Sequence, residues 1–283
     1  MNTLHIDLLG TETRYYDTGR FRTRVIEEGT GPALFLFHGG GGHAETYARN
    51  MNRLSAHYRA IAPDFIWHGL SSKPPFQKGN WLKQFTHQIL DLMDHLKIEK
   101  ASFEGESLGG WIVMDLGINH PDRVNKLILN TSWGMNLGVD KQEDLSSLRE
   151  TSLNALRNPT RELITKRLEW LMPLGGVTEE LVDLRMNLWA RPETRDSLIE
   201  YYENLFAPEC EHYQFTLQDL AKIKAKTLLL WTEKNPIAGP DAAFAMHEVI
   251  AGSAVHIVKG AAHWPQWERP EEHDQVVLDF LGR

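Results

Sequence analysis

The feature that most constrains this chain is a series of short apolar runs that alternate with stretches of helical periodicity. A short continuous apolar run suits a strand of a parallel sheet, because such a strand is buried on both faces. The runs occupy residues 33–37, 58–62, 101–103, 126–129, 227–231 and 254–258. Strands that alternate with helices build parallel sheets, so the sequence predicts an α/β fold.

Two other segments support this prediction. One shows apolar residues at steps of three and four, which predicts a crossover helix with one buried face. These residues are Leu82, Phe85, Ile89, Leu92, Met93 and Leu96. Near the N-terminus, the β-prone segments 14–16 and 22–26 flank a turn sequence at 17–20 and predict a hairpin.

The alternation stops between Trp133 and about Phe215, where the chain has helical character and no good strand. The large apolar residues of this segment include Leu168, Trp170, Leu171, Met172, Leu181, Leu184, Met186, Leu188 and Trp189. The segment is too long for an ordinary loop, and a cap over the strand ends is the natural assignment. We therefore expect a core domain of residues 1–132 and 216–283, with a helical cap at 133–215.

Composition limits the partners of the protein. The chain has 283 residues, with 38 acidic and 30 basic residues, and its formal charge of -8 argues against nucleic acid or an anionic membrane as the main partner. Its single cysteine, Cys210, excludes an intramolecular disulfide, and the first residues lack a basic segment followed by an apolar run. No apolar stretch approaches the roughly 20 residues that span a bilayer. We expect a cytoplasmic protein that acts on a small molecule.

The sequence Gly105-Glu106-Ser107-Leu108-Gly109 leads directly from a predicted strand into a helix. It matches the Gly-x-Ser-x-Gly nucleophile elbow, a tight turn that exposes the serine hydroxyl at a helix N-terminus. Positions two residues before and after the serine leave no room for a Cβ atom, and glycine meets this need. A chance glycine-rich turn is the alternative, but the position between a strand and a helix favours Ser107 as a nucleophile.

A serine nucleophile needs a base, and in enzymes with this elbow the histidine follows the last strand. His263 stands in that position, after the run at 254–258 and before the final helix. The other histidines lie in predicted helices, in early loops or near the N-terminus, where a structural role is the ordinary one. We expect His263 to be the base.

A glycine-rich stretch, HGGGG at residues 38–42, follows the first apolar run. Glycines let backbone N–H groups approach a developing oxyanion without a Cβ in the way. We predict that the N–H groups of Gly40 and Leu108 form the oxyanion hole, with Gly39 and Gly41 beside the substrate. A phosphate-binding loop is the alternative, but neither Gly-x-x-x-x-Gly-Lys-Ser/Thr nor a suitable Gly-x-Gly-x-x-Gly is present.

Together these motifs resemble the α/β-hydrolase family and, within it, the meta-cleavage-product hydrolases, which split carbon–carbon bonds in ring-opened aromatic dienoates. The matching stretches are 38–42 (HGGGG), 105–110 (GESLGG), 120–124 (HPDRV) and 263–268 (HWPQWE). They span the chain from about residue 33 to the C-terminus, apart from most of the cap. The first two stretches are common to many hydrolases, whereas the last is more discriminating. The resemblance implies the α/β-hydrolase fold, with a mostly parallel eight-stranded sheet and an inserted helical cap.

The resemblance also implies how a substrate is held. An arginine of the cap meets the substrate's carboxylate, with which a guanidinium pairs bidentately, and Trp264 meets its ring-derived part. The resemblance places this arginine at Arg191 or Arg185, although a solvated surface arginine is the common case. No motif calls for a metal or an organic cofactor.

The position behind the histidine departs from the family pattern. An aspartate is usual after the penultimate predicted strand, where this chain has Asn235. An amide can orient His263 by accepting its Nδ1–H, but it lacks the charge that stabilises imidazolium. The alternative acid position also holds an amide, Asn130, and the nearest carboxylates are Glu233 and Asp241. The identity of the triad acid therefore stays open.

We expect a serine hydrolase that uses Ser107 and His263 to cleave a carbon–carbon bond in a keto-dienoate-like or diketone-like small molecule. A carboxylesterase acting on small esters is one alternative. A cofactor-free dioxygenase or lyase is another, because a weakened triad suits a histidine that only abstracts a proton. A non-enzymatic small-molecule sensor is the least favoured, since elbow, glycines and histidine are all present. The sequence does not determine the oligomeric state, although homodimers are common among such enzymes.

Overall fold

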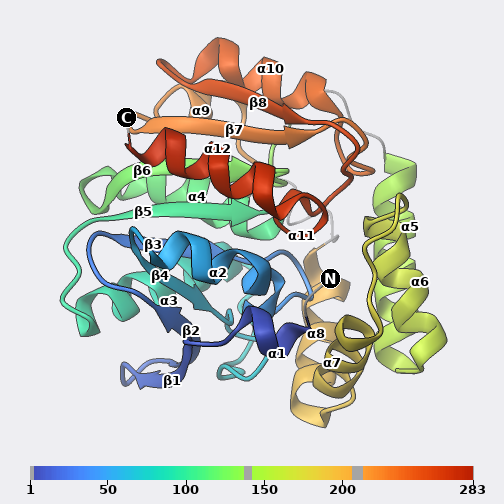
Figure 1. The fold of residues 1–283 in the computed structure, drawn as a ribbon. Coiled ribbons are helices and arrows are strands. Elements are labelled where there is room, and N and C mark those ends of the chain that lie inside the picture. Colours follow the sequence, from blue (N-terminus) through green and yellow to red (C-terminus); the bar gives the residue numbers. More distant parts are fainter. Residues whose placement is uncertain (1–2, 137–141, 206–212, 283) are drawn as a thin grey trace.

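The computed structural model describes residues 3–136, 142–205 and 213–282, so Cys210 lies outside the described residues. Eight strands form one sheet in the order β1-β2-β4-β3-β5-β6-β7-β8 (Figure 1). The strands are β1 (Glu12–Asp17), β2 (Arg22–Glu28), β3 (Ala33–Phe37), β4 (Arg59–Pro63), β5 (Ala101–Glu106), β6 (Val124–Asn130), β7 (Lys226–Thr232) and β8 (Ala254–Val258). The pairs β1·β2 and β2·β4 are antiparallel and the others parallel, which confirms the predicted hairpin and the mostly parallel sheet.

Both faces of the central parallel strands are buried, as their continuous apolar runs require, whereas the edge strand β8 is only partly buried. Every residue of β3 and β5 is buried. Alternate side chains enter different cores: Phe35 and Leu129 pack on one face, and Leu34 and Ile128 on the other. The two cores hold the sheet between two layers of helices (Figure 1).

The first core packs against α3 (Trp81–His95) and α4 (Leu108–Asn119), and the second against α2 (Ala48–Ser55) and α12 (Pro270–Gly282). The predicted crossover helix is confirmed as α3, whose buried face includes five of the six residues expected there; the sixth, Leu96, is the partly buried C-cap residue. The shorter helices are α1 (Leu4–Asp7), α9 (Leu217–Leu220), α10 (Pro240–Val249) and α11 (Pro265–Glu268), with 3-10 turns at Ala44–Tyr47 and Pro121–Arg123.

Between β6 and the short helix α9, the described residues form four longer helices: α5 (Gln142–Arg157), α6 (Arg161–Leu171), α7 (Glu179–Trp189) and α8 (Pro192–Leu205). They group beyond the carboxyl ends of the parallel strands (Figure 1). The hydroxyls of Thr160 and Thr178 cap the first turns of α6 and α7 by accepting backbone N–H groups. The apolar side chains of these four helices join the first core, which holds the helices against the core domain at the strand ends. The division at residues 132/133 and 215/216 stays a prediction.

In the part of the chain that the structure describes, no helix combines the length and apolar character needed to cross a membrane. The cytoplasmic location and the homodimer stay predictions.

Candidate active site

Ser107 occupies a strained turn between β5 and α4. Its φ of 53° and ψ of -115° lie in a region that residues other than glycine rarely adopt. A Cβ added at Gly105 would lie 2.3 Å from the carbonyl carbon of Gly109, and one added at Gly109 would lie 2.4 Å from the carbonyl oxygen of Phe37. Both glycines are therefore needed for the backbone to pass through this turn.

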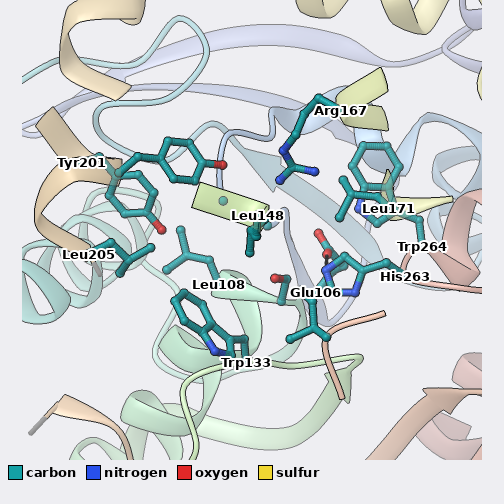
Figure 2. Close-up of a pocket in the computed structure, with 15 residues that line it drawn as sticks. Glu106, Leu108, Trp133, Leu148, Arg167, Leu171, Tyr201, Leu205, His263 and Trp264 are labelled. Atoms are coloured by element: carbon teal, nitrogen blue, oxygen red, sulfur yellow. Dashed lines mark ion pairs between the residues drawn. The ribbon is translucent and has the colours of Figure 1, made fainter. Parts of the chain in front are cut away.

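The sheet register brings the glycine-rich loop to the elbow. β3 and β5 pair in parallel with Phe37 beside Gly105, so the chain leaves both strands at the same point. Both segments line one pocket, together with the loop after β8 and the cap helices (Figure 2). The predicted residues that line it are Gly39, Gly40, Ser107, Leu108, His263 and Trp264.

Gly41 lies against the cap and does not line the pocket. Its carbonyl accepts a hydrogen bond from Nε1 of Trp189 at 3.1 Å. A Cβ at this position would lie 2.7 Å from the hydroxyl of Tyr202, and the φ of Gly41 is 70°. The structure thus places Gly41 at the joint between core and cap, where the sequence placed it beside the substrate.

His263 is buried and is oriented by Asn235. Nδ1 of the ring lies 2.8 Å from Oδ1 of Asn235. The backbone N–H of Ile237 donates to the same Oδ1 at 3.3 Å, which identifies this amide atom as the acceptor. Nδ1 must then carry a proton and donate it, so the amide fixes the tautomer that a triad carboxylate would fix.

The two carboxylates considered for the acid lie elsewhere. Glu233 is about half exposed and faces the backbone N–H of Gly260 at 3.4 Å. Asp241 is exposed in the first turn of α10. Of the residues considered for the triad acid, only Asn235 contacts His263 among the described residues.

Asn130 belongs to a buried polar cluster beneath the site. Its amide donates to Glu104 at 2.9 Å, and Glu104 also lies 2.6 Å from Nε2 of His273. The other ring nitrogen of His273 lies 2.9 Å from Asp274. Burial alone would lower the pKa of His273, but the two carboxylates outweigh it and raise this pKa to about 10. The cluster connects β5, β6 and α12 through charges that have no contact with solvent.

Glu106 is a functional residue that sequence reasoning missed. Its carboxyl oxygen Oε1 lies 3.0 Å from Nε2 of His263, the nitrogen opposite Asn235, and its side chain is 1% exposed (Figure 2). The contact is an ion pair by distance and not a hydrogen bond, and neither carboxyl oxygen has a hydrogen-bond partner among the described residues. The available signal was a carboxylate at the end of a predicted buried strand, directly before the nucleophile.

The structure does not bring Arg191 to the pocket, and this corrects its predicted placement. Its side chain is 52% exposed and pairs with Glu193 at 3.1 Å. Arg191 lies between the end of α7 and Pro192, the first residue of α8, so it projects from a corner of the cap. Arg191 is therefore a solvated surface arginine with an exposed ion pair.

Arg185 is buried on α7. Its guanidinium lies 5.4 Å from the ring centre of Trp189 and 5.6 Å from that of Trp264, which lines the pocket. Burial, and next the charge of Arg167, lowers the pKa of Arg185 to about 10. Its Nε and Nη2 have no partner within the described ranges. Its role with a substrate carboxylate stays a prediction.

Arg167 on α6 is the second residue that the sequence reasoning missed. It is 3% exposed, lines the pocket, and points its guanidinium into it (Figure 2). Nε donates to the hydroxyl of Ser152 at 2.7 Å, whereas Nη1 has no partner and no described carboxylate pairs with it. The signal was helical spacing, because Arg167 shares the buried face of α6 with Ile164 and Leu171.

The pocket is nearly closed. The space inside it that is open to water is about 20 Å³, and a single water needs roughly 10–15 Å³ on the same measure. Cap and core also share a backbone hydrogen bond, from His263 N–H to the carbonyl of Leu171 at 3.1 Å. A ligand larger than water therefore requires the cap or the lining side chains to move.

Comparison with known proteins identifies the family of this chain and several of its relatives. The family model described as alpha/beta hydrolase fold matches residues 32–270. A 2-hydroxy-6-oxononadienedioate/2-hydroxy-6-oxononatrienedioate hydrolase of Escherichia coli is 31% identical over 256 residues, which cover 88% of this chain and 87% of that protein.

Two solved structures share the fold. The 2-hydroxy-6-oxo-6-phenylhexa-2,4-dienoate hydrolase of Rhodococcus sp. strain RHA1 superimposes with a TM-score of 0.86 at 23% identity, covering 96% of this chain and 99% of that one. A serine hydrolase involved in carbazole degradation gives a TM-score of 0.81 at 22% identity, with the same coverage of 96% and 99%.

Proposed function

The chain belongs to the α/β-hydrolase family and, within it, to the meta-cleavage-product hydrolases, and we propose that it hydrolyses a carbon–carbon bond in a ring-opened aromatic keto-dienoate. The observation that carries this proposal is the arrangement of Ser107 on its strained elbow, His263 held by Asn235, and a closed pocket that contains an unpaired arginine.

Ser107 supplies the nucleophile for acyl transfer. The carbonyl carbon of the scissile bond meets Oγ, and the N–H groups of Gly40 and Leu108 are proposed to receive the oxyanion that forms. The His263 ring, held in the Nδ1–H tautomer, accepts the serine proton at Nε2. The departing fragment leaves with the electron pair of the carbon–carbon bond, and water then hydrolyses the acyl group from Ser107.

The substrate's carboxylate is proposed to bind Arg167, with Arg185 as its neighbour. A buried guanidinium without a counter-charge is costly, and an incoming carboxylate removes that cost by a bidentate pair. Arg167 lines the pocket. Arg185 does not line it, and its guanidinium lies 5.6 Å from the ring centre of Trp264, which does. This assignment replaces the sequence-based choice of Arg191.

The experiment compares wild type with Ser107→Ala and, as a matched control, Ser147→Ala on the exposed part of α5. Turnover of ring-cleavage dienoates is followed by the loss of their absorbance, and short-chain p-nitrophenyl esters are assayed in parallel. We expect Ser107→Ala to lose dienoate turnover by at least about 10³-fold while Ser147→Ala keeps it. Equal turnover by wild type and Ser107→Ala would refute the nucleophile. Oxygen consumption without dienoate or ester hydrolysis would instead favour the dioxygenase alternative.

A further inference from the structure

The backbone on both sides of His263 is bound by one carboxylate, that of Glu268 on α11. The N–H of Ala262 donates to its Oε2 at 2.9 Å and to its Oε1 at 3.1 Å, and the N–H of Trp264 donates to Oε1 at 2.9 Å. Hydrogen bonds to an ionised carboxylate are shorter and stronger than those to a neutral acceptor. Glu268 therefore holds the N–H groups directly before and directly after the histidine.

A helix cap explains only half of this arrangement. Trp264 is the N-cap residue of the short helix α11, and a carboxylate near the start of a helix commonly accepts the N-cap N–H. Ala262 stands two residues before the N-cap and outside the helix, yet its N–H binds the same carboxylate. The Glu268 side chain thus reaches beyond its own helix to the loop that carries His263. No step of the proposed reaction uses this last residue of the HWPQWE stretch.

The bonds of the His263 backbone itself come from neutral groups. Its N–H donates to the carbonyl of Leu171 at 3.1 Å, and its carbonyl accepts a hydrogen bond from the hydroxyl of Thr131 at 2.8 Å. Within the described ranges, Glu268 is the only charged side chain that bonds the backbone of residues 262–264. Its position and its charge can therefore both act on the histidine.

The charge matters because the residue that binds Nδ1 has none. Asn235 fixes the tautomer of His263, but an amide does not stabilise the imidazolium that forms when Ser107 gives up its proton. The Glu106 carboxylate lies near Nε2, the nitrogen that must receive this proton. Glu268 is bound at the backbone instead, where its charge acts on the ring without occupying Nε2.

We propose that Glu268 is a positioning residue for His263: its carboxylate fixes the histidine loop on both sides and adds nearby a negative charge that Asn235 cannot supply. The role of Glu268 rests on the proposed function through the Ser107–His263 mechanism, and it holds for any substrate that acylates Ser107. Glu268 does not line the substrate pocket. Its replacement should therefore impair the base and leave substrate binding nearly unchanged.

Other charged groups face Glu268 from the neighbouring elements. Burial raises the pKa of Glu268, whereas its bonds to Trp264 and Ala262 and the charges of His263 and Arg269 act in the opposite direction. The open groove beside Glu268 is also lined by charged residues of α1, α2 and α12: Asp7, Arg49, Arg53 and Glu271. All of them are retained when only Glu268 is replaced, so its variants report on its own carboxylate.

The test labels Ser107 with a fluorophosphonate between pH 5 and 9, a reaction that needs the nucleophile and its base but no dienoate. Glu268→Gln keeps the shape and loses the charge, Glu268→Leu also loses the acceptors, and Glu268→Asp keeps the charge with a shorter reach. Without the charge the imidazolium is less stable, so we expect the first two variants to lower the midpoint of the pH profile by about half a pH unit. Glu268→Asp should keep the wild-type midpoint. The limiting rate at high pH should fall by about 10–100-fold in Glu268→Leu, because His263 is displaced.

Glu271→Gln is the matched control, because it removes the same charge from the same groove at a side chain that is 77% exposed and pairs with Arg53. Its labelling profile should coincide with that of wild type. Urea unfolding is measured on each variant, since a residue that only caps α11 would lower stability and leave both the midpoint and the limiting rate unchanged. Wild-type midpoints and limiting rates in Glu268→Gln and Glu268→Leu would overturn the positioning role.

Steady-state kinetics with a ring-cleavage dienoate supply the second readout. We expect Glu268→Leu to lower kcat by about 10–100-fold and to change KM by less than about twofold. A larger change in KM than in kcat would overturn the positioning role, because Glu268 would then act on substrate binding. A wild type that is labelled but converts no dienoate would refute the proposed function alone, and the labelling comparison would still decide the role of Glu268.

Discussion

Replacement of Arg167 by methionine should make the unliganded protein more stable and a poorer catalyst. The guanidinium is buried, its Nη1 has no partner, and no described carboxylate pairs with it. Leaving a buried charge uncompensated costs roughly 3–5 kcal/mol. Methionine fills a similar volume without a charge, and its flexible chain adapts to the space between α5 and α6.

The magnitude follows from the contacts that the substitution removes. Arg167→Met loses the hydrogen bond from Nε to Ser152, worth roughly 1.5–3 kcal/mol for a charged donor. The Ser152 hydroxyl keeps its own bond to the carbonyl of Leu148 at 2.7 Å, so no new unsatisfied group is created. The difference leaves a gain on the order of 1–3 kcal/mol, and each kcal/mol raises Tm by about 2–4 °C in a chain of this size.

Catalysis should change in the opposite direction. Removal of one partner of a buried charge pair costs about 2–5 kcal/mol, which predicts a loss in kcat/KM of about 30-fold to 5,000-fold for a dienoate. A neutral p-nitrophenyl ester lacks the carboxylate and should lose less than about threefold. Urea unfolding and kinetics with both substrates test the two halves of this prediction. Arg191→Met is the matched control, because its exposed guanidinium should leave both properties within about 0.5 kcal/mol.

An Arg167→Met protein that is less stable than wild type would refute the reasoning, because Arg167 would then be a structural residue with a counter-charge in solution. Equal losses for dienoate and neutral ester would also refute it, since the guanidinium would not distinguish substrates by charge.

Three further predictions concern groups whose geometry is fixed by the core. Gly109→Ala should lower the free energy of unfolding by about 1–3 kcal/mol or more in urea titrations, because the new Cβ would lie 2.4 Å from the carbonyl oxygen of Phe37; wild-type stability would contradict this. The pKa of His273 is raised from 6.5 to about 10, so its stabilisation is complete below pH 6.5 and declines by about 1.4 kcal/mol per pH unit up to pH 10. Unfolding curves for His273→Gln should lack this slope. Asn235→Leu should reduce kcat by about 10²–10⁴-fold with little change in KM, because His263 loses the acceptor that fixes its tautomer; an unchanged kcat would show that the amide has no orienting role.

Most of the fold could be predicted because the local signals agree with one another. The runs at 33–37 and 254–258 coincide with β3 and β8, and the others differ from their strands only at the ends. The periodicity of α3 also specifies its buried face. Strand order does not follow from these local patterns, and the expectation of eight strands came from the family resemblance. The glycines of the elbow identify the turn because only a residue without a Cβ passes so close to Phe37 and α4.

The site was less predictable where its residues meet through tertiary packing. Helical spacing places Arg167 on the buried face of α6, and Arg191 lies in the turn between α7 and α8, but only the packing of α6 on α5 and α7 brings the guanidinium of Arg167 to the pocket. Glu106 presents a different difficulty. Its position in the elbow is explicit in the sequence, but its contact with His263 depends on a loop that follows β8, more than 150 residues later.

The charges of the closed pocket have a consequence for substrate binding. Arg167 and Arg185 are buried cations without carboxylate partners among the described residues. The cap therefore closes over an excess of positive charge, which disfavours the closed state when the pocket contains only water. A substrate carboxylate compensates this charge by pairing with a guanidinium. Substrate binding and closure of the cap are thus coupled by charge balance inside a pocket too small to admit water in quantity.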